Sequence, residues 1–306
     1  MGYGIGYQGS KSRIIKKLAE SFLPKENFYD LFGGGFAVTH YLLEEKKYHY
    51  KNYYFNDNRP GLCEFLQDVI RGKYNYDIFK PEWISKERFN KEKENNFYIK
   101  NLWSFGNNGK GYLYSKKLEE QKRSAHNAVI FNVFEGFIKD ELKLTAWPSD
   151  KKTIKEKRLY LDLIYRRKKL RYQLEHLERL ERLHKFENLK SINNLIFINL
   201  DYREVEIKPN SLIYCDIPYK NTYDKKKGLV CNYDYIKFDY NAFYNWAHDQ
   251  REPVFISEYE IQDPRFHLVK EINIRTTIYS TKKNIQTTEK LYCNEAAYKI
   301  IKYILK

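Results

Sequence analysis

The stretch FYDLFGGGFAVTHYL, residues 28–42, contains the pattern on which the fold of this chain depends. A short apolar run ends at Asp30, three glycines follow, and helical spacing begins directly after them. Glycines at such a turn let the backbone approach a ligand closely, so a nucleoside-type ligand can lie over the end of the strand. The alternative is an unconstrained turn, because a glycine run is a weak signal by itself.

Strands and helices alternate on both sides of this turn, and the alternation returns after residue 195. Such alternation is typical of an α/β fold with a parallel sheet. The further predicted strands are YYFND (53–57), NLIFINL (194–200), SLIYCDI (211–217), PVFISEY (253–259) and FHLVKEINI (266–274). The other predicted helices in these regions are SRIIKKLAESF (12–22), PGLCEFLQDVIRG (60–72) and FDYNAFYNWAHDQ (238–250).

The middle of the chain breaks this rhythm, because it is aromatic, polar and basic. We therefore predict a catalytic core made of residues 1–72 and 192–306, with a mainly helical insert at 73–191. Within the insert, residues 154–187 have the spacing of one long helix. Leu163, Leu170 and Leu177 recur there every seven residues and would form an apolar stripe.

A basic cluster accompanies the stripe. Residues 151–190 contain 14 Lys and Arg against 6 Asp and Glu. We predict that the stripe anchors the helix in the insert, or pairs it with a second copy of the chain, while the basic face follows nucleic-acid phosphates. The alternative is a solvated basic face. The predicted nucleic-acid-binding residues are Arg166, Arg167, Lys168, Lys169 and Arg171.

The composition of the 306 residues supports a polyanionic partner. Lys and Arg number 55 against 40 Asp and Glu, a net charge of +15, and 29 Tyr and 19 Phe could stack on bases. The four cysteines have no metal-ligand spacing. The N-terminus has no apolar signal region, and the apolar runs are too short to span a bilayer. These features predict a cytoplasmic protein without a metal site.

Asp57 ends the predicted strand within YYFNDN, residues 53–58. An acid at the tip of the second strand can accept hydrogen bonds from both hydroxyls of a ribose. The alternative is that Asp57 caps the following helix. The spacing from Asp30 and the run GGGFAV do not fit a dinucleotide fingerprint.

The tetrapeptide Asp216–Ile217–Pro218–Tyr219 follows the apolar run SLIYC and is therefore predicted at the tip of a buried strand. A carboxylate there can accept one N–H of an exocyclic amine, and the Ile217 carbonyl can accept the other, since Pro218 holds Ile217 extended. Tyr219 can stack on a planar base. This set would orient an amine for attack on an electrophilic methyl group. The alternative is a strand-ending turn.

The order of these motifs resembles that of the Dam-like (alpha-class, D12) DNA adenine-N6 methyltransferases. The resemblance implies a Rossmann-like S-adenosyl-L-methionine-dependent core with an inserted target-recognition lobe. It also implies methyl transfer to N6 of an adenine flipped out of double-stranded DNA. The matching stretches are YQGSKSRI (7–14), DLFGGG (30–35), NDN (56–58), LDYREV (200–205), CDIPY (215–219) and TEKLYCNE (288–295).

The resemblance assigns residues as well. Asp30 and Asp216 are predicted to balance the positive charge of the sulfonium, and no metal is predicted because the sulfonium already activates the methyl group. The implied cofactor-binding residues are Tyr7, Gly9, Lys11, Asp30, Phe32, Gly33, Gly34, Gly35, Asp57 and Asp201, and the implied catalytic residues are Asp216, Ile217, Pro218 and Tyr219.

Two positions depart from the family pattern. Ile217 replaces the usual first proline, which the chemistry tolerates because it uses the carbonyl. Phe36 stands where a further glycine often falls, so either the loop is displaced by one residue or Phe36 covers the cofactor. The alternative functions are a cytosine-N4 methyltransferase, a non-catalytic nucleic-acid-binding relative, and an enzyme acting on RNA.

Overall fold

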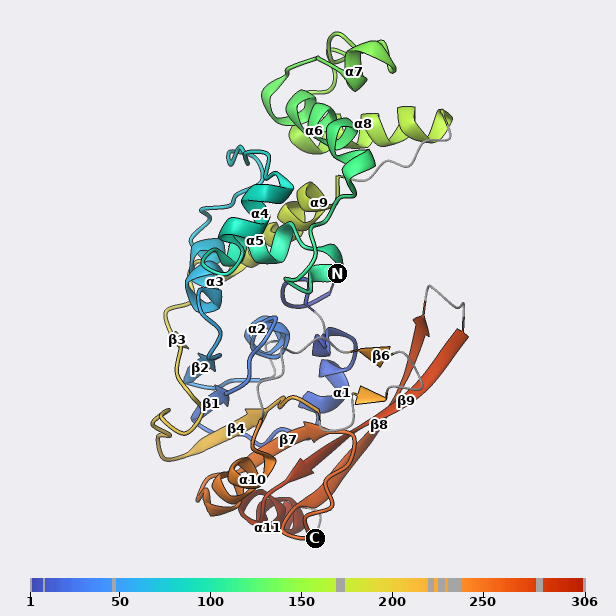
Figure 1. Ribbon diagram of the computed structural model, residues 1–306. Helices are drawn as coiled ribbons and strands as arrows, with labels where there is room; N and C mark the ends of the chain where they lie inside the picture. Colours follow the sequence, from blue (N-terminus) through green and yellow to red (C-terminus); the bar gives the residue numbers. More distant parts are fainter. Residues whose placement is uncertain are drawn as a thin grey trace. The chain divides into compact units, whose positions relative to one another are not determined.

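The chain divides into two compact units (Figure 1). The core unit comprises Met1–Arg59 and Ile192–Lys306, and the helical unit comprises Pro60–Ser191. The helical unit begins at Pro60, so it includes α3 (Leu62–Ile70), which the sequence pattern places in the core. The computed structural model describes residues 2–7, 9–45, 48–168, 174–219, 223–224, 229–230, 238–278 and 283–304.

The core unit is built on a seven-stranded sheet in the part of the chain that the structure describes (Figure 1). The strand order is β3-β2-β1-β4-β7-β9-β8; the first five strands are parallel, and β9 is antiparallel to both neighbours. The prediction of an α/β fold is confirmed. The strands are β1 (Asn27–Asp30), β2 (Asn52–Asn56), β3 (Leu195–Ile198), β4 (Ser211–Cys215), β7 (Val254–Glu258), β8 (His267–Ile278) and β9 (Lys283–Cys293), and a separate pair is β5 (Tyr223–Asp224) with β6 (Leu229–Val230).

The strand order reverses beside β1. From β1 the order runs to β2 and β3 on one side and to β4 and β7 on the other, and open α/β sheets bind ligands at such a reversal. Asp30 is in register with Phe55 of β2 and Tyr214 of β4. Asp57 and Asp216 each lie two residues beyond these partners, so the three acids follow one edge of the sheet.

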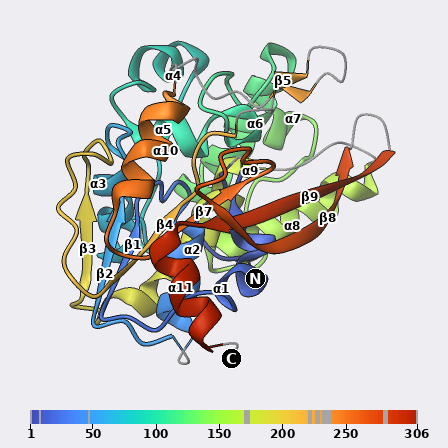
Figure 2. The ribbon, with the colours of Figure 1, turned by 90° about the horizontal axis from the view of Figure 1, so that it is seen from below.

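Both faces of the sheet are buried, which explains why its strands are continuous apolar runs. Phe28 packs on one face and its neighbour Tyr29 on the other. The first face is covered by α1 (Ile15–Ala19), α2 (Ala37–Glu44) and α11 (Glu295–Ile304), and the second by α10 (Tyr240–Asp249). Figure 2 shows α11 beside β9, with which it makes contact.

The helical unit contains only helices and irregular segments among its described residues, apart from one isolated bridge between Ser104 and Tyr112. Helix α6 packs against α7 and α8, α5 packs against α9, and α3 packs against η3. Besides α3, the helices are α4 (Lys86–Glu92), α5 (Phe97–Leu102), η2 (Phe105–Asn107), α6 (Lys116–Phe131), α7 (Phe137–Asp140), α8 (Ile154–Arg167), α9 (Glu175–Arg182) and η3 (Leu183–Leu189).

A chain of hydrogen bonds crosses the interior of the helical unit. The carbonyl of Pro81 can only accept, so His126 donates to it from Nε2 at 3.0 Å. With both imidazoles neutral, His176 then donates from Nε2 to His126 Nδ1 at 2.9 Å, and the Tyr114 hydroxyl donates to His176 Nδ1 at 2.7 Å. Burial lowers the pKa of His126 to about 4, which keeps this ring neutral at neutral pH.

The prediction of one long helix over residues 154–187 is wrong. Arg158 of α8 forms ion pairs with Glu178 and Glu181 of α9. In a continuous helix, residues 158 and 178 would be about 30 Å apart, so the chain must turn back between them. Helix α8 ends at Arg167 with Lys168 as its C-cap, and α9 begins at Glu175.

The predicted leucine stripe is therefore split. Leu163 lies in α8 with its side chain 45% exposed, whereas Leu177 is fully buried in α9. Leu170 lies outside the described residues. The continuous apolar stripe that suggested pairing of two chains is not formed, and we do not propose a homodimer on this basis.

Candidate active site

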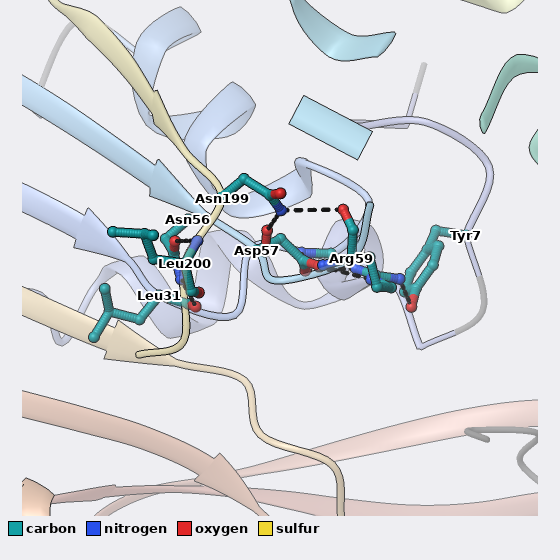
Figure 3. Close-up of polar contacts among 8 residues, drawn as sticks. Tyr7, Leu31, Asn56, Asp57, Arg59, Asn199 and Leu200 are labelled. Atoms are coloured by element: carbon teal, nitrogen blue, oxygen red, sulfur yellow. Dashed lines mark hydrogen bonds and ion pairs between the residues drawn. The ribbon is translucent and has the colours of Figure 1, made fainter. Parts of the chain in front are cut away.

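Asp57, directly after β2, is the centre of a polar cluster (Figure 3). Its Oδ2 accepts a hydrogen bond from the Gly34 backbone N–H, and its Oδ1 accepts one from the Arg59 backbone N–H, both at 3.0 Å. The Arg59 side chain adds two contacts, with Nε 2.7 Å from Oδ1 and Nη2 2.5 Å from Oδ2. The N-cap of α3 is Gly61, so the alternative role of Asp57 as a helix cap is wrong.

The Arg59 guanidinium also covers Tyr7. It lies 4.5 Å from the centre of the Tyr7 ring and donates a hydrogen bond to the Tyr7 hydroxyl (Figure 3). Burial raises the pKa of Tyr7, although the charge of Arg59 acts in the opposite direction. The N-terminal segment is thereby attached to the loop that follows β2, and Tyr7 is placed beside the glycine turn.

Asn56 holds the neighbouring loops together (Figure 3). Its side-chain amide donates to the carbonyls of Leu31 at 3.0 Å and Leu200 at 3.1 Å, and its side-chain oxygen accepts from the Leu200 N–H at 3.1 Å. The segments after β1, β2 and β3 are therefore fixed to one another at the carboxyl edge of the sheet. A buried amide with three hydrogen bonds has little freedom to move.

Neither Gly33 nor Gly35 in the glycine turn has room for a side chain. A Cβ atom on Gly33 would lie 2.0 Å from the Phe55 ring, and one on Gly35 would lie 2.6 Å from Tyr7 Cβ. Gly34 has φ +54°, a left-handed conformation that glycine adopts without strain. These contacts and the bond to Asp57 make the turn a closely packed structure rather than the unconstrained turn of the alternative interpretation.

The Phe36 side chain is part of the core rather than a cover for the cofactor. Its ring is fully buried and packs against Phe55, Phe197 and His40. The residue has φ 65°, the left-handed conformation in which glycine is usual. The backbone at Phe36 therefore has the conformation for which glycine is usual, while the Phe36 side chain packs in the core.

Asp30, the last residue of β1, has a carboxylate that is buried and only partly satisfied. Its Oδ2 accepts a hydrogen bond from the Thr39 hydroxyl at 2.8 Å, and its Oδ1 has no partner within the described structure. Burial raises the pKa of Asp30 to about 7. A buried carboxylate with an open oxygen is suited to a cationic group or N–H donor supplied by a ligand.

Asp216, just beyond β4, is held by a lysine from the opposite end of the chain. Lys11 Nζ lies 2.7 Å from Asp216 Oδ1 and 3.7 Å from Glu289 Oε2 of β9, and the lysine side chain is only 5% exposed. Burial acts to lower the pKa of Lys11, but the two carboxylates raise it above its usual value. Burial raises the pKa of Asp216 to about 6, against the lowering effect of Lys11.

Tyr219 lies beside the same charges. Its hydroxyl donates to Glu289 Oε2 at 3.2 Å, and Lys11 Nζ lies over its ring at 4.8 Å from the centre. The Pro218 carbonyl accepts a hydrogen bond from the Tyr240 hydroxyl at 2.9 Å. The Ile217 side chain is buried in the core, which gives a packing reason for isoleucine where the family pattern has proline.

The remaining predicted cofactor residues make local contacts. Phe32 packs on Tyr202 in the apolar cluster on the α10 side of the sheet. The Asp201 carboxylate accepts a hydrogen bond from Arg203 Nε at 2.7 Å and is about one-third exposed. The Gly9 carbonyl accepts from Lys11 Nζ at 3.5 Å. Their roles in cofactor binding stay predictions.

The predicted basic cluster begins in the last turn of α8. Arg166 is 76% exposed and pairs with Asp162 at 2.6 Å, and Arg167 lies beside it. Lys168, the C-cap of the helix, donates to the Glu141 carbonyl at 2.7 Å. Lys169 and Arg171 lie outside the described residues. DNA binding by these residues stays a prediction.

Sequence patterns did not identify two residues of this site. Glu289 lies within the stretch TEKLYCNE, but nothing local marks it as facing Lys11, because the strand carries polar residues on both sides. Arg59 follows the acidic motif directly, and the spacing Asp-x-Arg was a usable signal, since the same local pairing occurs at Asp201 and Asp263.

Among the residues that the structure describes, we looked for clusters of metal-binding side chains and for helices that could span a membrane. No group of three or more His, Cys, Asp or Glu among these residues could hold a metal ion. No helix within the described ranges combines the length and the apolar composition that crossing a bilayer requires.

A comparison with protein families covers most of the chain. A family model described as D12 class N6 adenine-specific DNA methyltransferase matches residues 7–293, which is most of the chain. The matched range includes Tyr7, Lys11, the glycine turn, Asp216 and Glu289. Among curated proteins, no match is found.

Proposed function

Because this chain belongs to the D12 class of N6 adenine-specific DNA methyltransferases, we propose that it transfers a methyl group from S-adenosyl-L-methionine to N6 of an adenine flipped out of double-stranded DNA. The observation that carries the proposal is the position of Asp216. Its carboxylate follows the central strand β4 and lies among Lys11, Tyr219 and Glu289. An amine acceptor at the ligand-binding edge of an α/β sheet is what methylation of an exocyclic amine requires.

The residues present fit the methyl donor. The open Oδ1 of buried Asp30 offers an acceptor for the positively charged end of the donor. The turn at Gly33 and Gly35 packs directly against Phe55 and Tyr7, which holds its backbone at the ligand-binding edge of the sheet. Asp57 stands beside this turn and bonds to Gly34, and the ribose hydroxyls would take the places of the Arg59 side chain on its carboxylate. We propose that these residues, together with Tyr7 and Asp201, hold the donor.

The bound donor supplies an electrophilic methyl group on a sulfonium. Asp216 accepts one N–H of the adenine amine, and the Ile217 carbonyl accepts the other, so that the nitrogen lone pair is directed out of the ring plane. Tyr219 provides a face on which the base stacks, a contact worth roughly 1–3 kcal/mol. Asp216 also receives the proton that the amine must lose, since burial has raised its pKa to about 6.

The helical unit is suited to binding the DNA. It contains 29 Lys and Arg against 19 Asp and Glu, so it carries most of the net positive charge of the chain. Phosphate contacts supply the sequence-independent part of DNA affinity. That affinity can offset the few kcal/mol needed to unstack and unpair the target base. We therefore propose that residues 60–191 form the target-recognition lobe.

The family match favours adenine over the alternative cytosine-N4 substrate. The retention of Asp216 and Tyr219 argues against a non-catalytic relative. The test is mass analysis of nucleosides from unmethylated double-stranded DNA and from RNA, each incubated with the protein and S-adenosyl-L-methionine. N6-methyladenine in DNA is expected. N4-methylcytosine, methylation confined to RNA, or no methylated nucleoside would each contradict the proposal.

Asp57→Ala is expected to weaken S-adenosyl-L-methionine binding by about 1–3 kcal/mol, because two ribose hydroxyls lose their acceptor. Calorimetry with the protein in the absence of DNA measures the change. Asp263→Ala is the matched control, since Asp263 binds Arg265 in the same Asp-x-Arg arrangement as Asp57 binds Arg59. Equal affinities of the Asp57 and Asp263 variants for S-adenosyl-L-methionine would show that Asp57 does not bind the ribose.

Arg166→Gln combined with Arg167→Gln is expected to flatten the salt dependence of DNA binding. Each lost phosphate contact changes the slope of log K against log salt by about 0.9, so two contacts change it by about 2. Lys299→Gln with Lys302→Gln removes the same charge from α11 of the core unit and should leave the slope closer to that of the wild type. If both double variants keep the wild-type slope, α8 does not contact DNA phosphates.

A further inference from the structure

Lys11 makes two of the contacts that the proposed function gives to the substrate adenine, one with Asp216 and one with the face of Tyr219. Its Nζ is 2.7 Å from Asp216 Oδ1, the distance of a charged hydrogen bond. The same nitrogen lies over the ring of Tyr219, 4.8 Å from its centre. A nitrogen that is held by this carboxylate and lies against this ring stands where the exocyclic nitrogen of a stacked adenine would stand.

We propose that Lys11 occupies the place of the adenine amine in the enzyme before DNA binds, and that Glu289 is the positioning residue that receives the Lys11 ammonium when the base arrives. The inference rests on the proposed function, because it concerns how the same site accepts its substrate. Base and ammonium cannot both bind Asp216 Oδ1 and the Tyr219 face, since each would fill the same space.

Glu289 is close enough to take the ammonium after a small movement. Its Oε2 lies 3.7 Å from Lys11 Nζ, which is about 1 Å longer than a direct charged hydrogen bond. The Glu289 side chain is 14% exposed, and its position is fixed by the hydroxyl of Tyr219 at 3.2 Å. A buried ammonium without a carboxylate would be strongly destabilised, so Lys11 can leave Asp216 only because this second carboxylate is present.

The displacement also suits the reaction. The lone pair of N6 forms the new N–C bond while the C–S bond breaks and its electrons stay on sulfur. The nitrogen then carries a positive charge and one proton more than the product, and this proton passes to Asp216. A lysine ammonium bound to Asp216 would oppose both events by its charge, whereas the same ammonium on Glu289 is neutralised away from the reacting nitrogen.

Glu289→Gln is expected to lower kcat by about 10- to 100-fold at saturating S-adenosyl-L-methionine, because the Lys11 ammonium then has no second carboxylate to which it can move from Asp216. The amide can still accept the Tyr219 hydroxyl, so this variant removes the charge with little change of packing. The affinity for S-adenosyl-L-methionine, measured without DNA, should stay at the wild-type value. Unmethylated bacterial chromosomal DNA serves as the substrate, and urea unfolding checks the fold.

The decisive comparison is the double variant Lys11→Met with Glu289→Gln. Removing the lysine should free Asp216, so the double variant should be more active than Glu289→Gln alone. Glu271→Gln, on the exposed part of the same hairpin, controls for the loss of one carboxylate. The inference is overturned if Glu289→Gln keeps the wild-type kcat, or if the double variant is no more active than the single one. Wild-type protein that methylates no DNA would instead refute the proposed function.

Discussion

Replacing Asp216 with alanine is expected to lower the rate of methyl transfer by a factor on the order of 10³. The change removes the acceptor of the amine N–H and of its proton at the reacting centre, and loss of one such group typically costs about 10²–10³ in kcat. The fold should persist, because Asp216 lies beyond the end of β4 and its side chain is not part of either apolar cluster. Incorporation of labelled methyl groups into unmethylated DNA measures the rate.

Asp216→Asn separates the two roles of the carboxylate. Its amide oxygen can still accept a hydrogen bond, but it cannot take up a proton at neutral pH, so this variant should keep part of the orientation and none of the proton transfer. S-adenosyl-L-methionine binding should survive in both variants, because Asp30 and the glycine turn are unchanged. A folded Asp216→Ala protein that methylates DNA at a substantial fraction of the wild-type rate would contradict the proposed role of Asp216.

Asp30→Asn is expected to stabilise the protein at pH 8 in the absence of the methyl donor, by about 2–4 kcal/mol in the free energy of unfolding. The folded-state pKa of Asp30 is raised from 3.8 to about 7, so folding favours its protonated form. The stability that it contributes is fully present below pH 4 and is lost as the pH rises to 7 and above, at about 1.4 kcal/mol per pKa unit. Asparagine cannot ionise and avoids this loss.

Urea unfolding of wild type and variant between pH 5 and pH 8 measures the difference, which should shrink as the pH falls. Asp263→Asn is the matched control. Arg265 holds the pKa of Asp263 below its usual value, so this group stays ionised throughout the range and the effect of its substitution should not vary with pH. A difference for Asp30→Asn that is constant from pH 5 to pH 8 would show that the buried carboxylate is not the cause.

The sheet could be predicted from the sequence because its strands are buried on both faces. The runs LIYC of β4 and VFI of β7 are apolar or aromatic at every position, and polar residues follow them directly. The positions of Asp57 and Asp216 followed from the same reasoning, since parallel strands bring their carboxyl ends to one edge. Local patterns were sufficient for everything that depends on one strand and its tip.

Contacts between segments that are distant in the sequence could not be predicted from local sequence patterns. Glu289 faces Lys11 only because β9 runs antiparallel beside β7 and the N-terminal segment reaches the same edge of the sheet. The break between α8 and α9 depends on ion pairs of Arg158 with residues twenty or more positions away. The seven-residue spacing of the leucines continued through the break, although Leu163 of α8 is 45% exposed and Leu177 of α9 is fully buried.

The discontinuity of the core unit has a consequence for biosynthesis. Strand β1 lies between β2 and β4, but β4 is made some 155 residues after β2, and the whole helical unit lies between them in the sequence. At 5–20 residues per second, the ribosome needs roughly 8–30 s to cover that distance. During this time β1 has one open edge and no completed apolar layer, whereas residues 60–191 form a continuous segment that can fold as soon as it emerges. The nascent chain is therefore expected to complete its helical unit first and to depend on protection of the early strands until β4 arrives.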